Sequence, residues 1–451
     1  MKQSSMKFIA GWALLLAQGA ARAQQVPEAY IRQAIANNLV LQEKKIGLDK
    51  SLLALKEARS LFLPTTSFDG QYLLAQGGRT IDVPAGDLVN PVYKTLNQLT
   101  GTNSFPQIGN VSEQLNPNNF YDVRVKTTMP IYNPDIRINR DIRAQQTGLQ
   151  QQEIDIYKRE LVKEVKQAYF NYLAAGKAVS IYQSALEVVN QNLKVNQSLL
   201  ANGKGLPAYV SRAESEVKQV ESQLQNAGND AGNARAYFNF LLNRSLADSI
   251  TIVDTDIDGS LLPAAEGNDI TAREELKSLA LAKDIDKNVL KMNQSFRTPR
   301  LNAFLDLGMQ GFDFTVQNKS FFYLGGVQLT FPLFTGNRNL YKIQQTQLDI
   351  KTLQLNTDQT RQQLELAALV SRNNITNAWN SYRSAQKQLE AARKYFTLID
   401  KGYREGVNSF IELLDARNQL TTGQLQVNIG KYKVLTALAD YERQTASYSF
   451  K

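Results

Sequence analysis

The sequence predicts a membrane protein of the α+β class, built from two internal repeats that each contain a pair of β-strands and a hairpin of long helices. Three observations lead to this fold class. Small and apolar residues recur at an offset of 203 positions, so that Gly203 corresponds to Gly406 and Ala213 to Ala416. Long tracts without proline carry apolar residues at helical spacing. Shorter tracts between them alternate apolar with polar residues.

The first residues have the pattern of a secretory signal peptide. Lys2 and Lys7 give a basic start, residues 8–17 form a short apolar run, and the triplet at 21–23 has a small residue at each end. We therefore expect residues 1–23 to be a signal peptide that is removed from the mature chain. No cysteine follows this point, so an anchor of lipid on an N-terminal cysteine is not expected.

Composition excludes several kinds of site. The chain has no cysteine and no histidine, so disulfides, thiolate nucleophiles, zinc sites made of these residues and Ser-His-Asp triads are impossible. No other group of residues predicts a catalytic site, a metal or a cofactor.

Beyond the signal peptide, no apolar run is long enough for a membrane-spanning helix. The net charge is +9, but the basic residues are scattered among acids, which is typical of solvated helix faces and not of a nucleic-acid surface.

We place the first repeat at residues 24–247. It begins with a helix, continues with strands near 64–74 and 119–130, and ends in a long helical hairpin whose tip lies near 203–207. The connection between its two strands, about 77–118, is rich in Gly, Asn, Pro and Thr and is expected to be a long loop.

The second repeat, at residues 271–447, follows the same order. Its strands are expected near 300–311 and 321–332, and the tip of its helical hairpin near 402–409. The counterpart of the long loop is short here. Two further segments lie outside the repeats, namely a linker or small equatorial element at 248–270 and a C-terminal tail at 448–451.

Proline-free tracts predict the long helices. No proline lies between Pro134 and Pro207 or after Pro332, and these tracts are rich in Gln, Leu, Ala, Glu and Lys. Their apolar residues step alternately by three and four positions, which is the spacing of coiled-coil packing. A helix over about 135–202 would be roughly 100 Å long. The two stripes consist of Tyr172, Ala175, Val179, Tyr182, Leu186, Val189 and Leu193, and of Ile375, Ala378, Tyr382, Ala385, Leu389, Ala392 and Phe396.

Glycines mark the expected ends of the long helices. Gly203 and Gly205 lie at the end of the first, and Gly402 and Gly406 at the end of the second. Glycine readily adopts the left-handed conformation that closes a helix, and Pro207 suits the first turn of the helix that follows.

The strand tracts carry apolar residues at alternate positions, from Leu301 to Met309, from Tyr323 to Phe331 and from Val123 to Met129. Residues 67–74 show the same pattern more weakly. Aromatic residues cluster at the strand ends, and this combination is typical of a transmembrane β-barrel. An ordinary sheet with one buried face also shows alternating apolar and polar residues, so it remains the alternative interpretation of these strands.

Four strands are too few to close such a barrel, since the smallest bacterial barrels have about eight. An open sheet in lipid would leave the backbone groups of its edges unpaired, at a cost of several kcal/mol each. If the strands lie in a membrane, several chains must therefore share one barrel. The pattern alone leaves two, three or four copies open.

Several short motifs lie in a fixed order along the chain. They are Tyr403-Arg404-Glu405-Gly406, the run from Phe410 to Arg417, and the turns at 61–64 and 331–334. Together with the repeat they resemble the TolC family of outer-membrane efflux factors, over about residues 28–447.

This resemblance implies a homotrimer with a twelve-stranded transmembrane β-barrel that continues into a long periplasmic α-helical barrel. The protein would lie in the outer membrane, in contact with its lipid, with most of its mass in the periplasm. It would be a passive duct of a tripartite export system, not an enzyme, for the efflux of drugs and other toxic small molecules. Its partners would be a periplasmic adaptor and an inner-membrane pump, without cofactor or nucleic acid.

The resemblance also assigns residues to a constriction and a gate. The family's tunnel narrows beside two acids, six and nine positions after the tip glycine, which are Glu412 and Asp415 here. Three copies would crowd these carboxylates, raise their pKa values and attract cations. Tyr403 matches the family's gate tyrosine, whereas Asn408 and Tyr209 stand in place of its arginine and aspartate. The lock would therefore be weaker or work differently.

The turns between the helices would form the docking surface for the adaptor, because turns with small side chains let helices meet end to end. The plain alternatives are that the glycines only end helices and that the two acids are only solvated. The expected docking residues are Gly203, Lys204, Gly205, Leu206, Pro207, Gly406, Val407 and Ser409.

Two other functions remain open at this point. The same architecture serves as the exit duct of a type I protein secretion system. A structural periplasmic coiled-coil protein would explain the stripes and the signal peptide, but it would not explain the alternating strands.

Overall fold

The computed structural model describes residues 28–253, 257–259, 262 and 269–450. The expected signal peptide at 1–23 lies outside these residues. None of the described helices is both long enough and apolar enough to cross a membrane. The chain divides into two compact units, which we treat separately. The strand unit contains Leu53–Arg143 and Lys287–Gln347, and the helical unit contains the rest.

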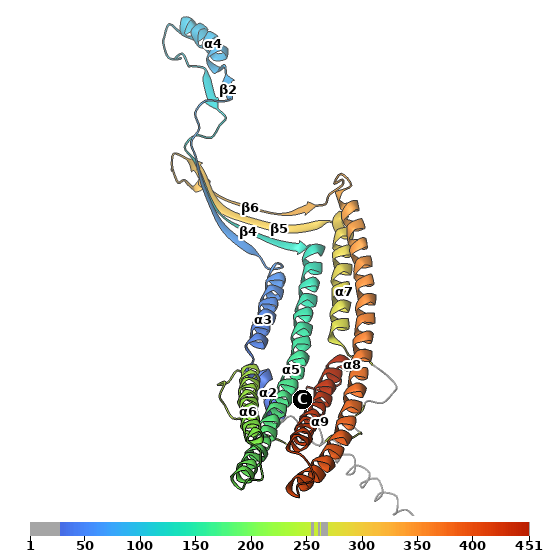
Figure 1. Cartoon of the computed structure of the whole chain (residues 1–451). Coiled ribbons are helices and arrows are strands. Elements are labelled where there is room, and N and C mark those ends of the chain that lie inside the picture. Colours follow the sequence, from blue (N-terminus) through green and yellow to red (C-terminus); the bar gives the residue numbers. More distant parts are fainter. Residues whose placement is uncertain (1–27, 254–256, 260–261, 263–268, 451) are drawn as a thin grey trace, which may run out of the picture. The chain divides into compact units, whose positions relative to one another are not determined.

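Helices account for most of the described residues (Figure 1). They are α2 (Glu28–Asn37), α3 (Leu39–Ser60), α4 (Ala85–Thr100), α5 (Pro134–Ala201), α6 (Pro207–Leu241), α7 (Glu274–Gln294), α8 (Arg338–Arg404) and α9 (Phe410–Thr445), with short 3-10 turns η2 (Ser295–Arg297) and η3 (Asn318–Ser320). The strands are β1 (Thr65–Leu73), β2 (Thr80–Val83), β3 (Val111–Gln114), β4 (Phe120–Tyr132), β5 (Arg300–Phe312) and β6 (Phe321–Thr330).

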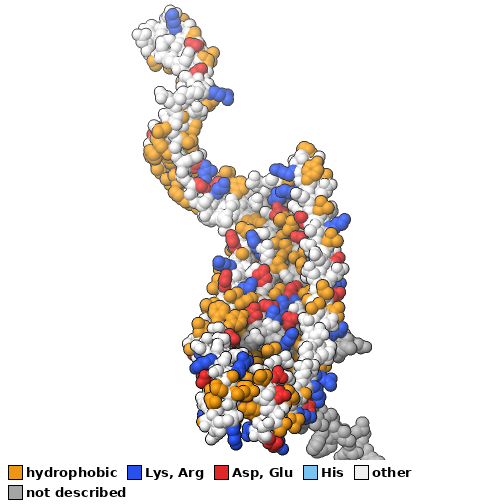
Figure 2. Space-filling model, viewed as in Figure 1, with side chains coloured by type: hydrophobic (Ala, Val, Ile, Leu, Met, Phe, Trp, Pro, Cys, Tyr) orange, Lys and Arg blue, Asp and Glu red, His pale blue; other side chains and the backbone are white. Residues whose placement is uncertain are grey.

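In the strand unit, four strands form one antiparallel sheet in the order β1-β4-β5-β6. β4 and β5 pair along nearly their whole length, with Arg124 opposite Gly308. The face that carries Phe68, Val125 and Tyr323 is exposed, to 74%, 41% and 80% respectively. Figure 2 shows hydrophobic side chains over this part of the chain. One face of the sheet therefore leaves large apolar side chains uncovered within a single copy.

The helical unit has its main core where α2, α5, α6, α8 and α9 meet. Tyr169 and Phe238 are fully buried, and the ring of Tyr30 packs edge-on against Phe238 at 5.2 Å. The second coiled-coil stripe faces inward, since Ile375 and Ala378 are buried. The largest buried cluster consists of Ile31, Ala34, Leu161, Val162, Val165, Ala168, Tyr169, Phe170, Leu173, Phe238, Leu241, Leu242, Ile250, Ile375, Ala378, Tyr382, Val434, Leu435 and Leu438.

The connection at 77–118 differs from the expected loop, because it contains β2, α4 and β3. Side-chain amides of α4 also bind the backbone of the segment that follows it. Asn90 exchanges two hydrogen bonds of 2.8 Å with the backbone of Ile108. Asn97 does the same with Phe105, at 2.7 and 3.0 Å. The asparagines that suggest an unstructured loop in the sequence instead fasten a small folded element.

Charged groups tie the end of the chain to the helical unit. The Arg159 guanidinium donates to Glu274 at 2.7 Å and to the carbonyl of Tyr448 at 2.8 Å. Nearby, Glu275 accepts from Arg273 at 2.7 Å and from Arg443 at 3.0 Å. The described end of the expected tail is therefore packed against the helices.

Candidate functional site

Two short turns join the long helices of the helical unit. Residues 202–206 connect α5 to α6, and residues 405–409 connect α8 to α9. Gly203 has a φ of 67° and Gly406 a φ of 79°. A Cβ atom at either glycine would meet no atom within 4 Å. The left-handed backbone, and not crowding inside the chain, is therefore what favours glycine at both positions.

Both turns close in the same way. The Lys204 amide donates to the Leu199 carbonyl at 2.9 Å, and the Val407 amide donates to the Gly402 carbonyl at 2.8 Å. This bond across five residues is the closing bond of a Schellman motif. After the turn at residues 202–206, the next helix, α6, begins at Pro207. The two turns thus have matching geometry at an offset of 203 positions.

The turns present apolar side chains to solvent. Leu206 is 56% exposed and Val407 is 79% exposed. Gly205 has a different role from Gly203, because a Cβ atom at Gly205 would lie 2.7 Å from the backbone nitrogen of Leu200. The turn therefore needs a residue without a side chain at this point.

Phe410 joins the two turns to each other. Its side chain is fully buried, with ring centroids 5.6 Å from Tyr209 and 6.0 Å from Tyr403. The Tyr403 hydroxyl donates to Asn196 Oδ1 at 3.0 Å. Burial raises the pKa of Tyr403 above its ordinary value. One residue from each of α5, α6, α8 and α9 thus meets in this cluster, which we call the tip cluster.

The structure brings together two of the three expected gate residues. Tyr403 and Tyr209 both contact Phe410, but Asn408 lies outside the tip cluster. Its amide donates to Glu412 Oε2 at 3.5 Å, in the turn itself. Phe410, the centre of these contacts, was not predicted from the sequence. The available signal was a large aromatic residue directly after a helix-ending turn.

Glu412 and Asp415 lie on the exposed face of α9. The Glu412 carboxylate accepts hydrogen bonds from the amide and hydroxyl of Ser409, at 2.7 and 3.0 Å. These bonds form a capping box and lower the pKa of Glu412 below its ordinary value. Asp415 accepts from the Gln419 amide at 2.7 Å. Within one chain, then, the local contacts of Glu412 oppose the rise in pKa that crowding between copies would cause.

A buried ion pair lies on the other side of α9, two positions after Asp415. Arg417 donates to Glu216 of α6 at 2.6 Å, and both side chains are only 4% exposed. Arg212 approaches the other carboxylate oxygen of Glu216 at 2.8 Å. A charge buried at this depth needs its partner. This pair therefore fixes α6 against α9, and no motif in the sequence predicts it.

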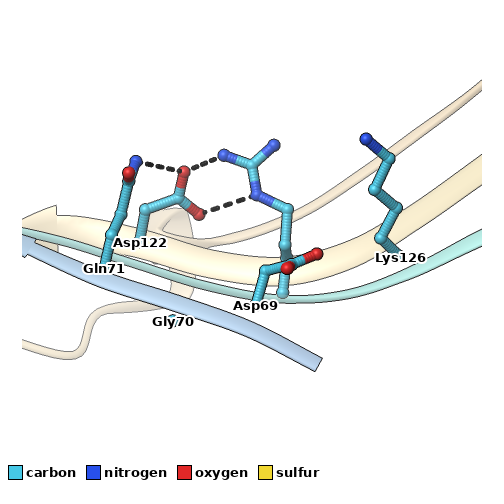
Figure 3. Close-up of a pocket in the computed structure, with 6 residues that line it drawn as sticks. Asp69, Gly70, Gln71, Asp122 and Lys126 are labelled. Carbon is cyan, nitrogen blue, oxygen red and sulfur yellow. Dashed lines mark hydrogen bonds and ion pairs between the residues drawn. The ribbon is translucent and has the colours of Figure 1, made fainter. Parts of the chain in front are cut away.

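A second polar site lies on the sheet (Figure 3). Arg124 stands between two acids, with its Nε 3.2 Å from Asp122 Oδ1 and its Nη1 3.6 Å from Asp306 Oδ2. Gln71 donates to Asp122 at 3.4 Å. The acids are 3% and 5% exposed as whole residues. A shallow pocket of about 380 Å³ is lined by Asp69, Gly70, Gln71, Asp122, Arg124 and Lys126.

The pairing of the strands explains this polar site. Asp69 pairs with Arg124 and Gln71 with Asp122 across β1 and β4. Gly308 lies opposite Arg124 on β5, and a Cβ atom there would come within 2.8 Å of the Arg124 Cβ. The alternation of residues in the sequence predicts that this face is polar, but it does not predict which charges meet, because that depends on the strand register.

Known proteins resemble this chain in sequence and in structure. A sequence model of the family described as "Outer membrane efflux protein" matches residues 30–244 and 272–443. The alkaline protease secretion protein AprF of Pseudomonas aeruginosa is 22% identical over 289 residues. That alignment covers 62% of this chain and spans 60% of the length of AprF.

Solved structures share the fold. The outer membrane channel CmeC of Campylobacter jejuni aligns with a TM-score of 0.71 at 14% identity, covering 93% of this chain and 85% of CmeC. The outer membrane protein VceC of Vibrio cholerae aligns with a TM-score of 0.72 at 13% identity, covering 93% of this chain and 95% of VceC.

Proposed function

Since the chain belongs to the outer membrane efflux protein family, we propose that it is a passive duct through the outer membrane, with no catalytic step. The observation that carries this proposal is that the family model matches both halves of the chain, at 30–244 and 272–443. In this duct the sheet lies in the outer membrane and most of the remaining mass lies in the periplasm. Small toxic molecules pass through it, driven by a partner pump.

Three copies form the duct, and within each copy the two halves are internal repeats. Support comes from the open sheet, since β1 and β6 are edge strands and one face leaves large apolar side chains uncovered. Both features are costly in a single copy and are removed when copies pair edge to edge in lipid. The polar face around Arg124 then lines the lumen. Three sheets of this kind give a twelve-stranded barrel above a barrel of helices.

The tips dock a periplasmic adaptor, which connects the duct to an inner-membrane pump. The exposed side chains of Leu206 and Val407 support a docking role. Glu412 and Asp415 of the three copies form the constriction at this end. Tyr403, Tyr209 and Phe410 hold the four helix ends together there, in place of the charged lock that the family resemblance implies.

A second function is the exit duct of a type I protein secretion system. The specific observation in its favour is the similarity to AprF, which is described as an alkaline protease secretion protein. The architecture is the same in both cases, and the difference lies in the partner pump and its cargo.

A deletion strain distinguishes the two functions. The strain is exposed to dyes, detergents, antibiotics and metal salts, and its secreted proteins are profiled in parallel. Broad sensitivity that the wild-type gene restores supports efflux, whereas the loss of one secreted protein supports secretion. If the strain shows neither change, the chain is not the duct of either system.

A further inference from the structure

The insertion between β1 and β4, residues 74–119, is held together by its own contacts. Asn90 and Asn97 fasten α4 to the segment that follows it, as described above, and the rings of Tyr93 and Phe105 lie 5.7 Å apart. β1 follows α3 and β4 precedes α5. The insertion therefore leaves the sheet at the end opposite to those two helices.

A different face of α4 carries uncovered apolar side chains. Leu88, Val92 and Leu99 are 70%, 57% and 78% exposed. With Thr95 between them, their spacings are four, three and four positions, which places all four on one narrow stripe of the helix. This is the spacing of a seam between two packed helices. We call these four residues the α4 stripe.

Two observations indicate what covers the α4 stripe. The polar side of the helix carries one acid, Asp87, and one base, Lys94, whereas helices that lie on anionic lipid are rich in basic residues. The sheet that carries the insertion has open edges at β1 and β6. In the proposed barrel, its neighbours are therefore other copies of the same sheet, and each of them carries the same stripe.

We propose that the α4 stripe docks on the α4 stripe of a second copy of this chain. The insertions of the three copies then form a small helical bundle at the end of the barrel opposite the periplasmic helices. This inference rests on the proposed trimer. It adds a contact between copies that lies outside the barrel wall and that buries Leu88, Val92 and Leu99.

Cysteine crosslinking tests the contact, because the chain has no cysteine of its own. Leu99→Cys places a thiol on the stripe. Lys94→Cys places one on the exposed polar side of the same helix, which also carries Asp87, away from the stripe, and is the matched control. In the purified full-length protein, a short bismaleimide should link copies through Leu99→Cys at least about tenfold faster than through Lys94→Cys, because the seam holds the thiols at high effective concentration.

Two further measurements separate the possible outcomes. Native mass spectrometry reports whether each variant is a trimer, and a bimane dye on Leu99→Cys in nanodiscs reports quenching by spin-labelled lipid. A trimer with equal crosslinking rates for both variants overturns the inference and leaves the proposed duct intact. Strong quenching by lipid also overturns it, because the stripe then lies on the membrane. A monomer overturns the proposed duct itself and, with it, this contact.

Discussion

Phe410 is the side chain through which the two turns of the helical unit contact each other. It is fully buried between Tyr209 and Tyr403. Tyr209 belongs to α6, which follows the first turn, and Tyr403 belongs to α8, which precedes the second turn. About two turns further along α9, the Arg417–Glu216 pair is buried, with both side chains only 4% exposed. The tip is therefore stabilised by an aromatic cluster backed by a buried ion pair.

We predict that Phe410→Ala lowers the free energy of unfolding by about 3–5 kcal/mol, because it leaves a cavity among four helices. Ile411→Ala is the matched control. Ile411 is the next residue and is 66% exposed, so the change should stay within about 0.5 kcal/mol. Urea unfolding followed by circular dichroism measures both variants. Equal losses would show that Phe410 is not the centre of the tip cluster.

The acids at the tip should control ion selectivity. The hydrogen bonds from Ser409 lower the pKa of Glu412, so its charge persists at neutral pH. In the proposed trimer, replacing Glu412 and Asp415 together by Ala should lower the preference for cations in planar-bilayer recordings. Glu390→Ala removes an exposed acid from α8, well over two turns before the helix ends at Arg404, and is the control. Unchanged selectivity in the double variant would place both acids outside the conducting path.

At the scale of the element, α8 and α9 approach closely at two glycines of α9. A Cβ atom at Gly430 would lie 3.2 Å from the Tyr382 Cα, and one at Gly423 would lie 3.4 Å from the Leu389 Cα. Both partners belong to the coiled-coil stripe of α8. The stripe therefore packs against a backbone as well as against side chains.

We predict that Gly430→Ala destabilises the protein by about 1–3 kcal/mol, because the added methyl group forces the two helices apart. Gly228→Ala makes the same chemical change on α6, where a Cβ atom has no neighbour within 4 Å. It should stabilise the protein by about 0.5–1 kcal/mol through helix propensity. Thermal unfolding of the two variants should give shifts of opposite sign. Shifts of the same sign would contradict the close approach at Gly430.

The start of α7 should make stability depend on pH. Burial alone would raise the pKa of Glu275, but hydrogen bonds from Arg273 and the charges of Arg273 and Arg443 lower it to about 2. A lowered pKa stabilises the fold above the unfolded value of 4.5, and this contribution is lost as pH falls from about 5 to about 2.

We predict that this group contributes about 3 kcal/mol at neutral pH. The wild-type free energy of unfolding should therefore fall more steeply than that of Glu275→Gln between about pH 5 and pH 2. Urea titrations at several pH values measure both proteins. If the free energies of unfolding of the two proteins change with pH in parallel, the Glu275 carboxylate has the same pKa in the folded and unfolded states.

At the scale of the whole molecule, the open sheet is the feature that a single copy leaves unresolved. Its apolar face is uncovered and its two edge strands lack partners among the described residues. If copies pair edge to edge within lipid, the lipid covers the apolar face and the edge strands gain partners, since a closed barrel leaves no unpaired edge.

The protein purified in mild detergent should therefore have three times the mass of one mature chain in native mass spectrometry. In planar bilayers it should pass a steady current, because three sheets would enclose a polar lumen in the proposed trimer. A monomer that passes no current would contradict the proposed duct.

Much of the fold was predictable from the sequence because the relevant signals are local. Heptad spacing and the absence of proline predict long helices at 135–202, and the structure places α5 at Pro134–Ala201. Alternation predicts strands near 300–311 and 321–332, where β5 and β6 lie. Each of these patterns is set by neighbours within one segment, so a single sequence contains it.

Tertiary structure decided which of these segments meet. Tyr403 and Tyr209 contact Phe410, whereas the Asn408 side chain donates a hydrogen bond to Glu412. Arg417 finds Glu216 about two hundred positions away. Periodicity determines which face of a helix is buried, but the partner on that face depends on how distant segments are brought side by side. The sequence by itself therefore determined the elements and the family, and the packing of helices and the strand register decided the composition of the sites.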